Sequence, residues 1–298
     1  MNSPIDLSRL PAPNIIEPLD FEQIFAALRT DLISREPELA DTLALESEPL
    51  TKLLEVAAYR ELLLRQRINE AAKAVMLAYA QDEDLEHLAA LFDVKRLEID
   101  PGEPDATPPV PPTFEGNDAL RRRVLLSLDG LSTAGPERAY VYHALSASGD
   151  VKDADAFSEA PGDVTVVVLS KFDNGAASNE LLSTISAAVN ASDTRPLTDH
   201  PTTVSAEIVS YAIRAILHIL PGPEAAVVRD NALAAADAYT QEQHRIGAQV
   251  TLSGVYAALH QPGVQRVELL SPTATLTTTR KQAPYCEAIE LESEVVNG

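Results

Sequence analysis

The sequence contains one cysteine and no tryptophan, and each shortage argues against a class of site. Cys286 has no second thiol to pair with, so the chain can form neither an intrachain disulfide nor a cysteine-rich zinc centre. A chain with so few thiols is typical of a reducing compartment. Aromatic residues make up only 5% of the sequence, which argues against a carbohydrate-binding surface built from stacking rings.

Basic residues are also scarce. The chain has 23 lysines and arginines against 45 aspartates and glutamates, a formal net charge of -22. Such a surface repels phosphate backbones, and nucleic-acid binding needs clustered cations, so we expect no nucleic-acid partner. The densest basic cluster is Arg121, Arg122 and Arg123, which is better explained as a solvated helix face or a local salt-bridge site.

Long apolar runs are absent as well. A membrane-spanning helix needs roughly 18 or more apolar residues in succession, and even residues 211–220 are interrupted by Arg214 and His218. The first 20 residues lack the basic start and apolar run of a signal peptide. We therefore expect no membrane partner.

Short motifs of catalysis or cofactor binding are missing too. The sequence has no P-loop, no dinucleotide-binding glycine motif, no HExxH, no GxSxG and no EF-hand loop. Cys286 has no visible base and is better explained as a small buried apolar residue. We predict no catalytic, cofactor-binding or metal-binding residues, and hence no enzyme. Because sites can also be assembled from distant residues, an enzyme with an unrecognised site in the C-terminal half stays as an alternative.

Apolar residues are plentiful: they make up 45% of the 298 residues, enough for a sizeable core and two or three domains. Prolines in the first 18 residues predict an extended arm, and a second proline cluster marks a domain boundary. The predicted segments are an N-terminal arm (1–18), a helical assembly domain (19–98), a proline-rich linker (99–117), a helical connector (118–150) and an α/β sandwich region (151–298).

The linker holds six prolines between Pro101 and Pro112, which predicts a polyproline-like spacer. Pro108 and Pro111 also form a P-x-x-P pattern of the kind that SH3 domains bind. No basic residue flanks the pattern, so a plain spacer is favoured over a ligand motif.

Two helices dominate the N-terminal part. The first begins after Asp20, a suitable N-cap, and the second is predicted from Pro49 to Gln81, about 50 Å long. An apolar ladder along the second helix forms the candidate interface of the chain: Leu50, Leu53, Leu54, Ala57, Leu64, Ile68, Ala72, Val75 and Tyr79. The ladder can be covered within the chain by the first helix and a short helix after residue 81, or by helices of another chain. The second interpretation is favoured because short helices cannot easily cover so long a rod.

The apolar period changes from helical to alternating after residue 150. Two strand-like stretches flank Pro161-Gly162, and a helix, further strands and two more helices follow. We predict an α+β protein with an N-terminal helical bundle, a small α/β sandwich with helices on one face, and a strand-rich C-terminal segment. The threonine-rich residues 273–281 predict an exposed edge or hairpin, with strand addition to a partner as the alternative.

Five stretches follow one another in a distinctive order. They are Asp84-Leu85, Leu88-Ala89, Phe92 and Arg96 after the long helix; an arginine-bearing helix, a Ser-Thr-Ala-Gly turn and a helix with Tyr140 and Ala144; Val151, Asp153-Ala154 and Pro161-Gly162-Asp163-Val164 in a strand pair; Arg195-Pro196-Leu197-Thr198-Asp199; and Pro262-Gly263-Val264 with Val267. Together they resemble the J-type baseplate family of contractile-tailed phages and phage-like particles, of the P2-like and Mu-like kind. The resemblance runs from about residue 20 to residue 292.

The resemblance implies a structural wedge protein with no catalytic residues. Its expected partners are other copies of the chain, a small I-type tail protein that shares a helical bundle, neighbouring wedges, and the central hub and sheath proteins. It implies assembly in the bacterial cytoplasm and a final place in the baseplate of a phage, bacteriocin or secretion particle. The alternative outside this family is a generic cytosolic scaffold.

Overall fold

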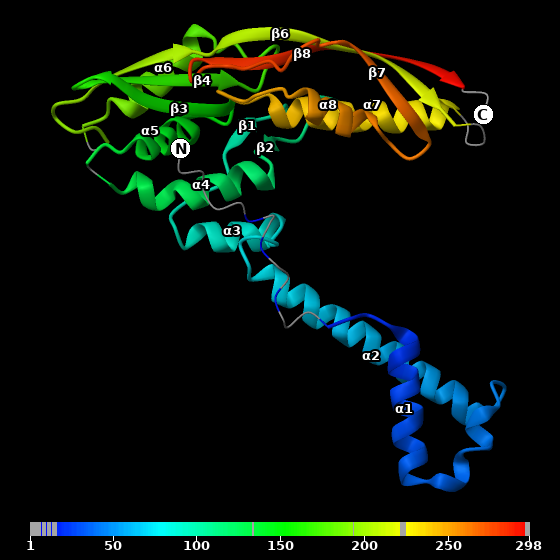
Figure 1. Cartoon of the computed structure of the whole chain (residues 1–298). Helices are drawn as coiled ribbons and strands as arrows, with labels where there is room; N and C mark the ends of the chain where they lie inside the picture. Colours follow the sequence, from blue (N-terminus) through cyan, green and yellow to red (C-terminus); the bar gives the residue numbers. More distant parts are fainter. Residues whose placement is uncertain are drawn as a thin grey trace. The chain divides into compact units, whose positions relative to one another are not determined.

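The computed structural model describes residues 7, 10, 13, 17–132, 134–192, 194–220 and 225–295 (Figure 1). The predicted arm, residues 1–18, lies outside this description apart from five positions. The described residues form two compact units, one from Met1–Lys95 with Asn117–Arg121 and one from Arg96–Gly116 with Arg122–Gly298.

The first unit is helical. Its elements are α1 (Phe21–Arg35), the short 3₁₀ helices η2 (Pro37–Leu39) and η3 (Thr42–Ala44), α2 (Pro49–Ala74) and α3 (Asp82–Ala90). The predicted start of α1 is confirmed, because the Asp20 carboxylate accepts a hydrogen bond from the Gln23 amide at 3.0 Å. Ile24, Leu43 and Ala58 are the buried apolar residues of α1, η3 and α2.

The long helix ends earlier than the sequence predicts. It stops at Ala74 instead of Gln81, so it is about 39 Å long instead of about 50 Å. Beyond it, the guanidinium of Arg121 donates to the carbonyl oxygens of Leu77 and Ala80, at 2.7 and 2.8 Å. A side chain 41 residues or more away along the sequence thus binds carbonyls that a longer helix would use, which no local pattern reveals.

The proline-rich segment is more ordered than a spacer. In the second unit, β1 (Glu98–Asp100) pairs with β2 (Thr113–Phe114), and Glu103 and Val110 exchange two backbone hydrogen bonds between them. Gly102 has a φ of 68°, and a Cβ there would overlap the Val110 carbonyl. The prediction of a polyproline-like conformation is therefore wrong for this stretch, because its two ends pair through their backbones and form a hairpin.

A three-stranded sheet with helices on one face follows, as predicted. Its elements are α4 (Asn117–Gly130), α5 (Glu137–Ala147), β3 (Val151–Ala160), β4 (Asp163–Ser170), α6 (Asn179–Val189) and β5 (His200–Ser205). Strand β4 lies between antiparallel β3 and parallel β5. Val166 and Val168 face the core beneath α5 and α6, whereas Val167 and Leu169 belong to a second core that includes Ala283.

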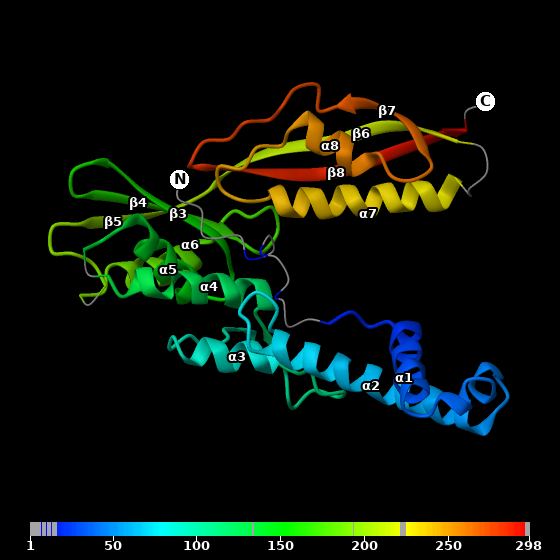
Figure 2. The same ribbon diagram turned by 60° about the horizontal axis from the view of Figure 1, so that its bottom comes forward.

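The C-terminal part repeats this design. Its elements are β6 (Glu207–Ile219), α7 (Ala225–Gln243), α8 (Leu252–Leu259), β7 (Val264–Ser271) and β8 (Gln282–Val295). Strand β6 is central, and Figure 2 shows α7 and α8 on one face of this sheet. The threonine-rich stretch is not a strand: its pairing is one isolated bridge between Leu276 and Val250. The predicted α+β class, with helices first and small sheets after them, is confirmed.

Candidate assembly interface

Helix α2 has one packed side. Thr51, Ala58 and Asn69 are its buried residues, and their spacing places them on one face of the helix. Asn69 accepts a hydrogen bond from the Glu17 amide at 2.9 Å and donates to the Glu17 carbonyl at 2.8 Å. Arg65 adds ion pairs to Glu17 and Glu61. This side of α2 is thus held by contacts within the chain.

The opposite side of α2 is apolar, and none of the described residues of the first unit buries it. At about 100° per residue, it lies roughly 140° around the helix from the packed side. Leu53 and Leu64 are each 63% exposed, and Val75, just beyond the last turn, is 70% exposed. We call the following residues the α2 stripe: Leu53, Ala57, Leu64, Ile68, Ala71 and Val75, all of which are exposed.

The predicted ladder divides into two groups. Leu53, Ala57, Leu64, Ile68 and Val75 lie in the α2 stripe, whereas Leu50, Leu54, Ala72 and Tyr79 are half-buried. Val75 and Tyr79 also lie beyond the observed end of the helix, and the Tyr79 hydroxyl donates to the Leu10 carbonyl at 3.3 Å. The ladder as an interface stays a prediction.

The ladder omitted further exposed apolar residues of the same helix. Val56, Tyr59 and Leu63 are exposed beside the stripe, and they widen its apolar surface. The signal for them was present in the sequence, because apolar residues off the main ladder indicate a helix with more than one neighbour.

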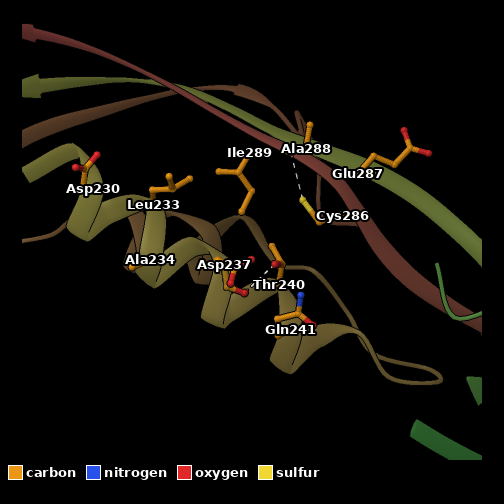
Figure 3. Close-up of a pocket in the computed structure, with 10 residues that line it drawn as sticks. All are labelled: Asp230, Leu233, Ala234, Asp237, Thr240, Gln241, Cys286, Glu287, Ala288 and Ile289. Carbon is orange, nitrogen blue, oxygen red and sulfur yellow. Dashed lines mark hydrogen bonds between the residues drawn. The ribbon is translucent and has the colours of Figure 1, made fainter. Parts of the chain in front are cut away.

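A pocket of the second unit lies between α7 and β8 and has a volume of about 520 Å³ (Figure 3). Its polar lining includes Asp230, Asp237 and Glu287, and Leu233 and Ile289 supply apolar surface.

Cys286 also lines this pocket, and its geometry resembles that of a structural cysteine. Burial raises the pKa of its thiol, and its Sγ donates to the Ala288 carbonyl at 3.4 Å. A thiol with a raised pKa stays protonated at neutral pH and is a poor nucleophile.

The surroundings of His244 strongly change its protonation. Burial, followed by the charge of Lys152, lowers its pKa to about 4. The ring packs edge-on against Tyr285. It is therefore neutral at physiological pH and is held in the core of the second unit.

Metal binding and membrane insertion are two further classes of site. No group of three or more histidine, cysteine, aspartate or glutamate side chains is placed to hold a metal ion in this part of the chain. None of the helices between residues 17 and 295 that the structure describes is long and apolar enough to cross a membrane.

Comparison with known proteins identifies the family. Three family models match successive parts of the chain: the Baseplate J-like N-terminal domain at residues 46–103, the Baseplate J-like central domain at 132–206, and the Baseplate J-like protein C-terminal domain at 211–292. The chain belongs to the baseplate J family. Its similarity to Baseplate protein J of Escherichia phage P2 is 47% identity over 299 residues, covering 99% of this chain and 98% of that protein.

A solved structure gives a more distant likeness. It is the anti-feeding prophage (AFP) baseplate determined by cryo-electron microscopy, matched with 18% identity and a TM-score of 0.43. The match covers 61% of this baseplate J chain and spans 44% of the AFP chain.

Family membership gives the chain a structural role in the baseplate of a phage-type tail particle. The phage P2 relative is named as a baseplate protein, which favours a structural over a catalytic role. The uncovered stripe on α2 is then the feature of the first unit that most needs a partner.

Proposed function

We propose that this chain is a wedge component of the baseplate of a contractile tail. The helical assembly domain joins copies of the chain and a small I-type tail protein in a shared helical bundle. The α/β part links neighbouring wedges into a ring around the hub, close to the sheath. Assembly takes place in the bacterial cytoplasm before the tail is complete.

The observation that carries this proposal is the α2 stripe. A globular chain that acts alone covers its large apolar side chains, because each buried leucine, isoleucine or valine contributes about 1.5–3 kcal/mol. Leu53, Leu64 and Ile68 are instead more than half exposed on one helix face. Residues in this pattern are typical of a helix that packs against further helices.

The two sheets of the second unit have their own buried clusters. The second unit can therefore fold independently of what binds α2. These separate clusters support separate roles for the two parts. The N-terminal helices assemble the wedge, and the α/β part makes the lateral contacts. The proline-rich residues 99–117 then serve as the connection between the two functions.

The test is co-purification after a change to the stripe. Leu64→Asp with Ile68→Asp should reduce recovery of the small tail protein encoded beside this chain at least about tenfold, because two carboxylates would have to be buried in the bundle. Both side chains point away from the packed side, so the variant chain should fold. The measurement is size exclusion with light scattering on the co-expressed proteins.

A matched control changes two leucines that are equally exposed but lie on another helix. Leu128 and Leu131, at the end of α4, are 65% and 78% exposed. Leu128→Asp with Leu131→Asp should leave the complex with the small tail protein intact. A complex that survived the change at Leu64 and Ile68 would contradict the shared bundle.

A further inference from the structure

Two arginines lie within the apolar α2 stripe. Arg60 and Arg67 are seven residues apart and share the face that carries Leu53, Leu64 and Ala71. Both are exposed, and neither forms an ion pair with any residue that the structure describes. A cation in the middle of an apolar stripe is unusual, since it weakens an interface that offers it no partner.

Several other cations of the helical unit do have partners. Lys52 pairs with Glu55 at 2.8 Å, Arg65 pairs with Glu61, and in α1 Arg35 pairs with Asp31 at 3.1 Å. These pairs occur at the helical spacings of three and four residues. Among the residues that the structure describes, the two stripe arginines are therefore the cations of α2 that lie on the exposed apolar face and form no ion pair.

Their spacing works against pairing of the stripe with itself. In a parallel pair of α2 helices in register, Arg60 would face Arg60 and Arg67 would face Arg67. In an antiparallel pair centred midway between Leu63 and Leu64, Arg60 would face Arg67. Both arrangements place like charges against each other in a partly dry interface, which is destabilising.

An acidic helix removes this conflict. Carboxylates seven residues apart on an apolar helix face would meet Arg60 and Arg67 while the apolar residues between them pack on Leu64 and its neighbours. The planar guanidinium suits such a contact, because it can bind a carboxylate with two hydrogen bonds while its aliphatic stem stays in the apolar surface.

Helix α7 of this chain carries two aspartates seven residues apart, Asp230 and Asp237. Both aspartates line the pocket beside β8 together with Glu287 and Ile289, so their face of α7 is shared with the sheet edge. Asp230 is already paired with Arg229 at 3.2 Å. Helix α7 of a second copy is therefore a poorer match than a free helix of another polypeptide.

We propose that the α2 stripe is covered by a helix of a different polypeptide whose apolar face carries carboxylates at a spacing of seven residues, opposite Arg60 and Arg67. This inference rests on the proposed bundle and adds the chemistry of its partner. In this arrangement the α2 stripes of two copies in one wedge do not contact each other. The acidic helix either lies between the two stripes, or each stripe binds an acidic helix of its own.

The test uses the full chain and two designed helical peptides. Both peptides carry leucines at spacings of three and four residues; one has glutamates every seven residues on that face, and the other has lysines there. Fluorescence anisotropy should show that the wild-type chain binds the glutamate peptide about tenfold or more tightly than the lysine peptide. The preference should shrink at high salt, because the ion pairs are screened.

Charge reversal provides the decisive comparison. Arg60→Glu with Arg67→Glu should invert the preference, and the neutral pair Arg60→Gln with Arg67→Gln should abolish it. The matched control is Lys73→Glu, on the same helix but away from the stripe, which should leave the preference unchanged. Circular dichroism verifies that each variant is as helical as the wild type.

Three results would overturn the inference: equal binding of the two peptides, binding of neither, or self-association of the wild-type chain that depends on Arg60 and Arg67 together with Asp230 and Asp237. The last result would assign the stripe to α7 of a second copy. If Leu64→Asp with Ile68→Asp abolishes the complex with the small tail protein but the peptides are not distinguished, the bundle stands and only the acidic partner is rejected. If Leu64→Asp with Ile68→Asp does not affect the complex with the small tail protein, and Arg60→Glu with Arg67→Glu does not affect peptide binding, both proposals fail.

Discussion

At the scale of single residues, the three consecutive arginines of α4 have three different roles. Arg121 donates to the carbonyls beyond α2, Arg122 pairs with Asp153 at 2.6 Å, and Arg123 forms a buried ion pair with Glu115. The sequence predicts either a solvated face or local salt bridges, and the structure confirms the second. The sequence could not predict the partners, because Asp153 is 31 residues from Arg122 and the contact between them depends on tertiary packing.

His244 gives a prediction about pH. Its pKa falls from the ordinary 6.5 to about 4 in the folded chain, so the unfolded chain binds more protons between these values. Its contribution to stability is therefore complete above pH 6.5 and is lost as the pH falls toward 4. Between pH 7.5 and pH 5.0 the free energy of unfolding should drop by about 2 kcal/mol from this group.

Urea unfolding followed by circular dichroism at the two pH values measures this effect. His244→Gln should remove most of the drop, since glutamine does not titrate. His87, which is exposed on α3, provides the control, because His87→Gln should keep the full dependence. An equal drop in the wild type and in His244→Gln would contradict the assignment.

At the scale of elements, the helices and strands follow the apolar periods of the sequence closely, whereas their ends do not always do so. The start of α1 is fixed locally by the Asp20 cap. Beyond the end of α2, by contrast, the carbonyls of Leu77 and Ala80 are bound by Arg121, which belongs to another helix. Likewise, the prolines between residues 101 and 112 predict local chain stiffness, but the hairpin there is decided by pairing of β1 with β2.

The end of α2 can be tested by removing the guanidinium that binds it. Arg121→Met should free the carbonyls of Leu77 and Ala80 and destabilise the first unit by about 2 kcal/mol, through the loss of two charge-assisted hydrogen bonds. Hydrogen exchange measured by mass spectrometry should become faster in residues 75–85. Arg29→Met, on α1, is the control and should leave this segment unchanged.

At the scale of the whole molecule, the two units have separate buried clusters. Ile24, Leu43 and Ala58 belong to the first, and the sheets with their helices belong to the second. Clusters that share no residues can unfold in separate steps. We expect two calorimetric transitions for the chain.

Two cavity variants assign these transitions. Leu43→Ala should destabilise only the first unit, and Ile185→Ala only the second, each by about 3 kcal/mol, because both side chains are at most 1% exposed. Scanning calorimetry of both variants measures the shifts. A single transition that moves equally in the two variants would show that the units unfold together.

Much of the candidate interface followed from the sequence as well. The helical spacing of Leu53, Ala57, Leu64 and Ile68 predicted one face, and the structure places these residues together and exposed. The half-buried state of Leu50 and Leu54 could not be predicted, because it depends on which neighbours pack beside them. The unpaired state of Arg60 and Arg67 likewise depends on where every acidic side chain lies.

The sequence by itself determined the family, the α+β class, the order of helices and strands, and the apolar face of α2. These properties depend on residue types and on periods of two or 3.6 residues, which are local and additive along the chain. Only the tertiary structure decided where α2 ends, which arginines have partners, and that the proline-rich segment is a hairpin. Each of those features depends on where a second residue lies in the folded chain, which the residue types along the sequence do not give.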